Sequence, residues 1–302
     1  MSKTLIYVSG PTGIGKTSLS IELAKRLKTE IISCDSRQFY KELKIGTSPP
    51  TNEQLKEVNH HFIFNKSIVD DYNVGDYEKD SISVVSKLFK TSDKVILVGG
   101  SGLYADSLLF GMDDIPSVPI EIKNKLNIEF KDRGLIYLQE KLREIDLEYY
   151  KAVDLNNPNR LIRAIGVYET SGKKISSLRR NAKKSRNFNS IVIMIKTDRD
   201  KLYERINQRV DKMIIDGLEE EAHRLIKFKE YNALNTVGYK EYFLYFDGKL
   251  SKDGAINKIK QNTRNYAKRQ ITWFKKYTNA LEFKNDDNID ELLNKIRKNE
   301  LH

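Results

Sequence analysis

The stretch GPTGIGKT, residues 10–17, limits the folds open to this chain more than any other feature. It fits the pattern G-x-x-x-x-G-K-[ST] and lies between a short apolar run and an amphipathic segment. Glycines let backbone N–H groups wrap a phosphate, and the N-terminus of the following helix attracts the same anion. Lys16 adds a charge, and the Thr17 hydroxyl suits Mg²⁺. The predicted cradle consists of Gly10, Pro11, Thr12, Gly13, Ile14, Gly15, Lys16 and Thr17.

This motif predicts a bound di- or triphosphate but leaves its identity open between ATP, GTP and another diphosphate ester. The chain around it predicts an α/β fold with a P-loop NTPase-like parallel sheet flanked by helices. The expected strands are 4–8, 30–34, 94–98 and 190–196, and the expected helices between them include 16–27 and about 75–91. Ligands of such sheets lie beyond the carboxyl ends of the strands. We therefore expect Gly10, Asp35 and Gly99 to meet in one crevice.

Residues 120–187 interrupt this alternation, because they are charged, mostly helical in pattern and without a clear strand. We interpret them as an inserted all-helical subdomain that divides the catalytic core into 1–119 and 188–302. The insertion ends in a basic run, 173–186, which contains no acid. Such a run is either a solvated loop or a contact for phosphates.

The net charge of the 302-residue chain is +11, which favours a polyanionic partner such as nucleic acid. A general richness in Lys is the alternative explanation. Cys34 is the single cysteine, which excludes an intramolecular disulfide and a cysteine-based metal site and fits a reducing cytoplasm. No apolar run is long enough to span a membrane. The first strand begins so early that we expect no signal peptide.

Polar residues follow two of the expected strands. Asp35 can take a proton from an acceptor or hold Mg²⁺ indirectly, although Asp is also a common helix cap. Arg37 and Gln38 are residue types that read base edges. The strand 94–98 ends in Gly-Gly-Ser-Gly, with Ser101, where an ordinary P-loop ATPase has an acid. This absence weakens an ATPase interpretation, although a tight turn would also explain the glycines.

Three further segments carry arginine or lysine at helical spacing. Arg160 and Arg163 lie three apart and suit an RNA backbone, or simply form a solvated face. Arg205 and Arg209 lie four apart, and either could neutralise a leaving group, or both could be surface residues. In 263–276 we expect Ala267, Ile271 and Phe274 to form a buried stripe, beside a basic stripe of Arg264, Lys268 and Lys275. We expect Trp273 to pack rather than to stack on a base.

These segments together resemble the tRNA dimethylallyltransferases, also called tRNA isopentenyltransferases. The matching segments are GPTGIGKT (10–17), DSRQFY (35–40), IGT (45–47), VGGSGLY (98–104), NPNRLIRAI (157–165), RINQRVDKMI (205–214), VGYKE (237–241) and TRNYAKRQITWF (263–274). The family usually has Thr at the position of Ser101, which keeps the hydroxyl. It usually has Ala-Leu-Glu where this chain has Ala164, Ile165 and Gly166.

The resemblance implies that the loop holds dimethylallyl diphosphate and that the dimethylallyl group passes to N6 of adenosine 37 in tRNAs reading codons that begin with U. It implies Asp35 as general base, Ser101 near the reacting amine, and Lys16, Arg209 and Mg²⁺ on Thr17 at the diphosphate. Its implied partner is the tRNA anticodon stem-loop. We separately expect the protein to be cytoplasmic and monomeric. The implied tRNA contacts are Asp35, Ser36, Arg37, Gln38, Ser101, Lys123, Asn159, Arg160, Leu161, Ile162, Arg163, Gly238, Tyr239, Lys240, Arg264 and Lys268.

Three alternatives share parts of this pattern. A P-loop kinase using ATP would have the same loop and the Asp after the second strand, but it would not need the basic helix or the insertion. An adenylate isopentenyltransferase would prenylate free AMP or ATP and would lack a full tRNA clamp. A non-catalytic RNA-binding module would not need Lys16, Thr17, Asp35 and Arg209 together.

Overall fold

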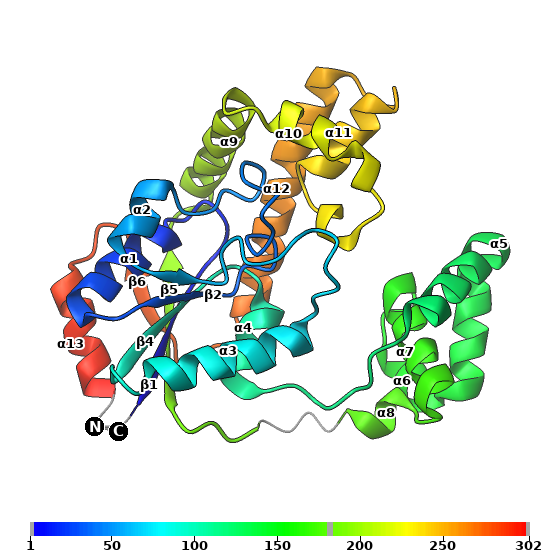
Figure 1. Ribbon diagram of the computed structural model, residues 1–302, viewed down its shortest axis with the longest axis horizontal. Helices are drawn as coiled ribbons and strands as arrows, with labels where there is room; N and C mark the ends of the chain where they lie inside the picture. Colours follow the sequence, from blue (N-terminus) through cyan, green and yellow to red (C-terminus); the bar gives the residue numbers. More distant parts are fainter. Residues whose placement is uncertain (1–2, 180–183, 300–302) are drawn as a thin grey trace. The chain divides into compact units, whose positions relative to one another are not determined.

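The computed structural model describes residues 3–179 and 184–299 (Figure 1). The chain divides into two compact units, Met1–Phe110 with Ser185–His302, and Gly111–Lys184. The expected insertion, 120–187, begins and ends later than this second unit. Residues 180–183 of the basic run lie outside the described residues.

The first unit is built on a parallel sheet, as the sequence predicts. Among the described residues this sheet has six strands in the order β3-β2-β4-β1-β5-β6, and every pairing is parallel. The strands are β1 (Thr4–Ser9), β2 (Ile31–Ser33), β3 (His60–His61), β4 (Lys94–Val98), β5 (Asn189–Lys196) and β6 (Leu281–Lys284). The sequence did not predict β3 and β6, since a strand of two or four residues at a sheet edge leaves little periodic signal.

Helices cover both faces of this sheet (Figure 1). Those of the first unit are α1 (Lys16–Leu27), α2 (Asn52–Glu57), α3 (Val74–Leu88), α4 (Gly102–Phe110), α9 (Arg199–Ile215), α10 (Leu218–Arg224), α11 (Tyr239–Phe246), α12 (Lys252–Phe274) and α13 (Ile289–Asn299). The predicted helix 16–27 is confirmed to the residue, and the predicted helix at about 75–91 corresponds to α3.

Alternation along each strand separates two cores. In β1, Ile6 and Val8 pack on one face with residues of α1, α9 and α13. Leu5 and Tyr7 pack on the other face with residues of α3, α4 and α12. A parallel sheet buried on both faces is the ordinary α/β solution. A third cluster joins α10, α11 and α12 around Tyr239.

The strand order places a crevice at β1 and β4. These strands are neighbours, yet the chain leaves β1 towards β2, beyond β4, and leaves β4 towards β5, beyond β1. Where connections from adjacent parallel strands run in opposite directions, the space between the two following loops binds ligands. Here those loops are the phosphate loop and the Gly-Gly-Ser-Gly turn.

The second unit is helical throughout its described part, which confirms the predicted all-helical insertion. Its helices are α5 (Ile120–Ile145), α6 (Leu147–Ala152), α7 (Pro158–Ser171) and α8 (Ile175–Leu178). Gly134 interrupts α5 with a left-handed φ of 77°. The helix α7 begins at Pro158, and the Asn157 side chain caps it by accepting from Arg160 N.

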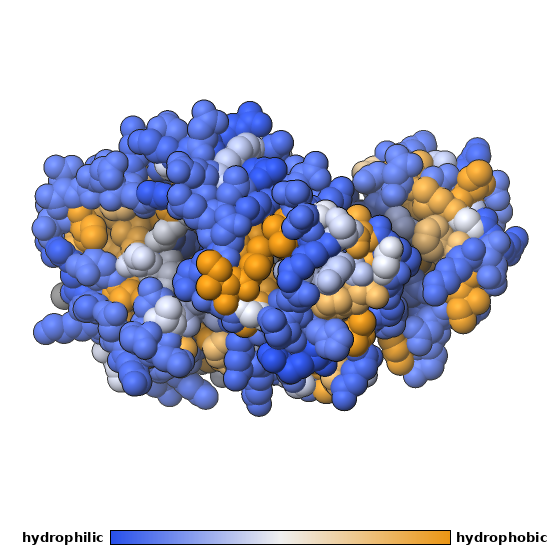
Figure 2. All heavy atoms as spheres, turned by 90° about the horizontal axis from the view of Figure 1, so that it is seen from above, coloured by the Kyte–Doolittle hydropathy of each residue, from blue (hydrophilic) through white to orange (hydrophobic). Residues whose placement is uncertain are grey.

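Polar side chains cover most of the face drawn in Figure 2, with apolar residues gathered in smaller patches. Within the described ranges, no helix has both the length and the apolar character needed to cross a bilayer.

The predicted stripe on α12 is partly wrong. Ala267 and Phe274 are buried, but Ile271 is 41% exposed. The face of α12 that meets the sheet includes Gln270 instead, which is only 5% exposed. Trp273 is 39% exposed, and its indole N–H donates to Asp106. Periodicity alone could not separate these positions, because an adjacent polar residue turns inward.

Phe274→Ala should lower the free energy of unfolding by about 3–5 kcal/mol, because it leaves a cavity beside Tyr7 and Tyr277. Urea denaturation at 25 °C measures this change. Ile271→Ala, on the same helix but exposed, should cost no more than about 0.5 kcal/mol. Equal losses in the two variants would contradict this placement of α12.

Candidate functional site

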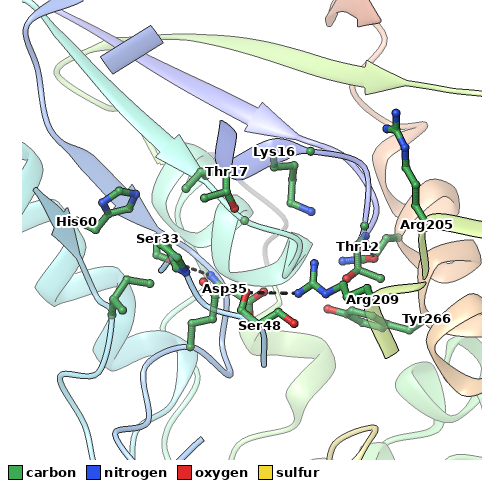
Figure 3. A pocket seen from close by; sticks show the side chains of 18 residues that line it. Thr12, Lys16, Thr17, Ser33, Asp35, Ser48, His60, Arg205, Arg209 and Tyr266 are labelled. Carbon is green, nitrogen blue, oxygen red and sulfur yellow. Dashed lines mark hydrogen bonds between the residues drawn. The ribbon is translucent and has the colours of Figure 1, made fainter. Parts of the chain in front are cut away.

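A polar cavity of about 270 Å³ lies at the carboxyl ends of β1, β2 and β4. Figure 3 shows the side chains around it converging from α1, the β2 end, α9 and α12. The lining residues are Thr12, Gly13, Gly15, Lys16, Thr17, Ser33, Asp35, Gln38, Ser48, Pro50, His60, Ile63, Val98, Gly99, Arg205, Arg209, Tyr266 and Gln270. The structure thus brings together the phosphate loop, Asp35 and Arg209.

The phosphate loop is shaped for an anion. Gly15 caps α1 in the left-handed region, with φ 105°, and the first turn of α1 contains no acid. The N-terminal N–H groups of a helix and its dipole favour a negative ligand. The Lys16 ammonium donates to the carbonyl of Pro11 at 2.9 Å, which keeps the charge within the loop. Thr17 faces the same cavity.

Of the charged residues that line the cavity, Lys16, Arg209 and Asp35 interact with one another electrostatically. Burial and, to a smaller extent, the charge of Arg209 lower the pKa of Lys16 to about 8, while Asp35 opposes this shift. Burial also lowers the pKa of Arg209, against the attraction of Asp35. Burial disfavours a charged form that lacks a sufficient counter-charge. The cavity is therefore short of negative charge and suited to a polyanion.

Asp35 and Ser101 come from neighbouring strands and are linked through Ser36. The Ser36 N–H donates to Ser101 Oγ at 3.1 Å, and the two hydroxyls lie 3.1 Å apart. The Asp35 carboxylate accepts from Arg37 N at 3.0 Å, which orients it. A Cβ on Gly99 would lie 2.6 Å from Cys34 Sγ. Only glycine permits this close approach of the two strand ends.

Gln270 is a cavity residue that sequence reasoning did not single out. Its side-chain oxygen accepts from Thr12 N at 2.8 Å, and its amide donates to Gly100 O at 2.9 Å. It thus joins the phosphate loop to the turn after β4. The sequence did not predict its role, because no pattern distinguishes an inward-facing glutamine from the exposed polar residues of a basic helix.

Tyr266 and His60 were also not singled out as cavity residues. Burial raises the pKa of Tyr266 to about 12, so its hydroxyl remains a donor at neutral pH. His60 Nδ1 contacts Val58 O at 2.8 Å, which favours the tautomer protonated there. Its Nε2 is then an acceptor in the cavity wall. The sequence showed only an adjacent pair of histidines.

The arginine pair of α9 separates in the structure. Arg209 Nη2 donates, over long distances of 3.5 and 3.4 Å, to the carbonyls of Thr47 and Ser48. Arg205 also lines the cavity, but Figure 3 shows its guanidinium directed away from Arg209. Of the pair, Arg209 is the one whose charge acts on both Lys16 and Asp35.

Residues expected to contact tRNA in the first unit fall into two groups. Arg264 is half-buried and donates to Asn207 at 2.7 Å, while Lys240 and Lys268 are exposed. Arg37 donates to Asn232 O at 2.8 Å, and Gln38 to Ser48 O at 3.1 Å. Gly238 is buried and its N–H donates to Glu241.

Three residues expected to contact tRNA have buried side chains in the free protein. Tyr239 is fully buried and its hydroxyl donates to Glu221. Leu161 and Ile162 belong to the apolar core of the second unit. These three side chains pack inside the protein and support the fold around the matching motifs. Lys123, Asn159, Arg160 and Arg163, also in the second unit, are exposed.

The donor set fits a magnesium ion that shares its coordination with a phosphate. The oxygens of Thr17, Ser33 and Asp35 lie around the cavity, and Mg²⁺ prefers such hard ligands. Among residues 3–179 and 184–299, no cluster of three His, Cys, Asp or Glu side chains could hold a metal by itself. Binding through one hydroxyl, phosphate oxygens and water is the usual arrangement for Mg²⁺.

Comparisons with known proteins agree with this geometry. The sequence pattern of the IPP transferase family matches residues 38–277. The tRNA dimethylallyltransferase of Christiangramia forsetii is 50% identical, with 98% of each chain covered. The crystal structure of the tRNA isopentenylpyrophosphate transferase of Bacillus halodurans has a TM-score of 0.70 at 33% identity and covers 98% of this chain and 95% of its own. A eukaryotic dimethylallyltransferase acting on tRNA, at 24% identity, shares the fold with a TM-score of 0.77, covering 94% of this chain and 74% of its own.

Affinity for inorganic diphosphate should fall as pH rises above about 8, because Lys16 then loses its proton in the free protein. Above this pKa, Lys16 must take up a proton when the anion binds. The dissociation constant therefore rises by up to about tenfold per pH unit. Titration calorimetry between pH 7 and 10 measures it.

Lys16→Arg is the matched control, since a guanidinium stays charged across this range. It also reports any effect of diphosphate's own ionisation. An identical pH dependence in the variant and the parent protein would remove Lys16 from the anion site.

Proposed function

Because this chain belongs to the IPP transferase family, the tRNA dimethylallyltransferases, we propose that it transfers the dimethylallyl group of dimethylallyl diphosphate to N6 of adenosine 37 in tRNAs that read codons beginning with U. The supporting observation is one cavity that combines the phosphate loop after β1 with the Asp35 carboxylate after β2. The turn after β4, at Gly99 and Gly100, has no acid to position a hydrolytic water.

Asp35 acts as the general base in this proposal. The N6 lone pair of adenine is delocalised, so the amine must lose a proton as its bond to carbon forms. The N–C bond forms at C1 of the dimethylallyl group, the C–O bond to diphosphate breaks, and Asp35 takes the N6 proton. The products are N6-dimethylallyladenosine and diphosphate. Ser101, held beside Asp35 through Ser36, contacts the amine or the adjoining tRNA backbone.

Lys16 and Arg209 stabilise the leaving diphosphate. Both lie in the cavity as incompletely neutralised cations, so they gain most when negative charge develops on the leaving oxygen. Mg²⁺ held by Thr17 and the diphosphate would supply further neutralising charge. In this proposal these groups bind the diphosphate and not the amine. Other residues therefore determine which acceptor is used.

The acceptor is a flipped base of the anticodon loop. A base undergoing chemistry must leave its stack, and Arg37, Gln38, Lys240, Arg264 and Lys268 of the first unit are the proposed contacts. Lys123, Asn159, Arg160 and Arg163 of the second unit are proposed to clamp the stem-loop. We further propose that the protein works as a monomer in the cytoplasm.

The experiment that tests this proposal offers labelled dimethylallyl diphosphate and Mg²⁺ to three acceptors in parallel. These are an unmodified U-reading tRNA with adenosine 37, the same tRNA with guanosine 37, and free AMP. Label should enter the first alone. Label in AMP would support the adenylate isopentenyltransferase alternative. ATP consumption without label transfer would support the kinase alternative.

Asp35→Asn should reduce the single-turnover rate by about 10²–10⁴-fold, the usual contribution of a positioned base. Affinity for the anticodon stem-loop should be retained, because the amide is isosteric. Asp93→Asn is the matched control. Asp93 precedes β4, at the opposite end of the strand, and forms an ion pair with the partly exposed Lys3. A full rate in Asp35→Asn would exclude Asp35 as the base.

A further inference from the structure

A buried carboxylate outside the cavity lining binds the loop that contributes Ser48 to the cavity wall. Glu221, in α10, is 3% exposed. It accepts backbone N–H bonds from Lys44 at 3.0 Å, Ile45 at 3.0 Å and Gly46 at 3.1 Å. It also accepts the Tyr239 hydroxyl at 2.6 Å. One carboxylate therefore gathers the donors of three successive residues of the loop 44–48.

The same loop is held by shape. A Cβ on Gly46 would lie 2.6 Å from the ring of Tyr239, which is itself fully buried. The loop can approach α11 this closely only because residue 46 is glycine. Glu221 and Tyr239 thus fix the position of residues 44–46 from two helices.

Of the next two residues of the loop, Ser48 lines the cavity. Ser48 lies in the left-handed region, with φ 42°, and its N–H closes a turn onto Ile45 O at 3.0 Å. This turn aims the carbonyls of Thr47 and Ser48 at Arg209, as Figure 3 shows for Ser48. The Gln38 amide donates to the same two carbonyls, at 3.3 and 3.1 Å.

A continuous set of contacts therefore runs from Glu221 to the guanidinium of Arg209. Glu221 fixes residues 44–46, these residues fix the turn at 47 and 48, and the turn holds Arg209. Charge-assisted hydrogen bonds such as those of Glu221 are stronger and more directional than neutral ones. Without them, three N–H groups would lose their acceptor, and the loop would rearrange to satisfy them with water.

We propose that Glu221 is a positioning residue for diphosphate binding: through the loop 44–48, it places Arg209 opposite Lys16. This inference rests on the proposed function for the identity of the anion. Glu221 touches neither the diphosphate nor the acceptor, and its effect reaches them through Thr47, Ser48 and Arg209.

The direction in which anion affinity changes distinguishes a positioning role of Glu221 from a direct effect of its negative charge. Removing a negative group near an anion site would strengthen anion binding if only Coulomb attraction mattered. Displacing Arg209 would weaken it. Weaker binding in a variant that loses negative charge therefore identifies the loop as the cause.

The test is the dissociation constant of inorganic diphosphate with Mg²⁺, measured by titration calorimetry on the full chain. Glu221→Gln should raise it about tenfold, the effect expected from losing charge-assisted hydrogen bonds. KM for dimethylallyl diphosphate should rise with it, while affinity for the stem-loop stays unchanged. Glu220→Gln, an exposed neighbour on α10, is the matched control and should change the dissociation constant by less than about twofold.

Measurements are made well below the melting temperature of each variant, so that a purely structural role would not change the dissociation constant of the folded protein. An unchanged or lowered constant in Glu221→Gln overturns the inference. If that variant does not fold, Gly46→Ala decides, because its methyl group displaces the loop from Tyr239 and leaves Glu221 in place. It should weaken diphosphate binding in the same direction, and unaltered binding overturns the inference.

Different results would refute the proposed function and the role of Glu221. If the unaltered protein binds no diphosphate and transfers no dimethylallyl group, the proposed function is wrong. If it does both and the variants match it, only the role of Glu221 is wrong.

Discussion

Two cations held in one partly desolvated cavity, beside a single carboxylate, are the interaction on which the rest of the site depends. Lys16 and Arg209 each have a lowered pKa because of burial, and the positive charge of Arg209 lowers that of Lys16 further. Asp35 offsets only part of this cost. A diphosphate supplies the missing negative charge, so binding and leaving-group stabilisation arise from the same electrostatic imbalance. The sheet serves to keep these groups together.

Residues far apart in the sequence share this task. The phosphate loop follows β1, Asp35 follows β2, Ser101 follows β4, and Arg209 comes from α9. The strand order brings the first three to one edge of the sheet. Arg209 depends on a side-chain and backbone network instead. Gln270 adds a similar link, since it bonds both the phosphate loop and the turn after β4.

The sequence predicted the parts of this arrangement that rest on local patterns. The phosphate loop, its helix and the buried strands each have a characteristic spacing, and the all-helical insertion stood out by its lack of strands. Gln270 and Glu221 have no such spacing, because their importance comes from partners that are distant in the chain. Ile271 was misplaced since an apolar residue can stay exposed at little cost. Leu161, Ile162 and Tyr239 lay in family motifs, but burial assigns their side chains to packing.

The most direct measurement is the crystal structure of the protein with an A37 anticodon stem-loop and a non-reacting thio analogue of dimethylallyl diphosphate. The account predicts the analogue's diphosphate in the 10–17 loop between Lys16 and Arg209. It also predicts adenine N6 within hydrogen-bonding distance of Asp35, on the side of C1 away from the diphosphate. A diphosphate bound outside that loop, or an adenine amine out of reach of Asp35, would contradict it.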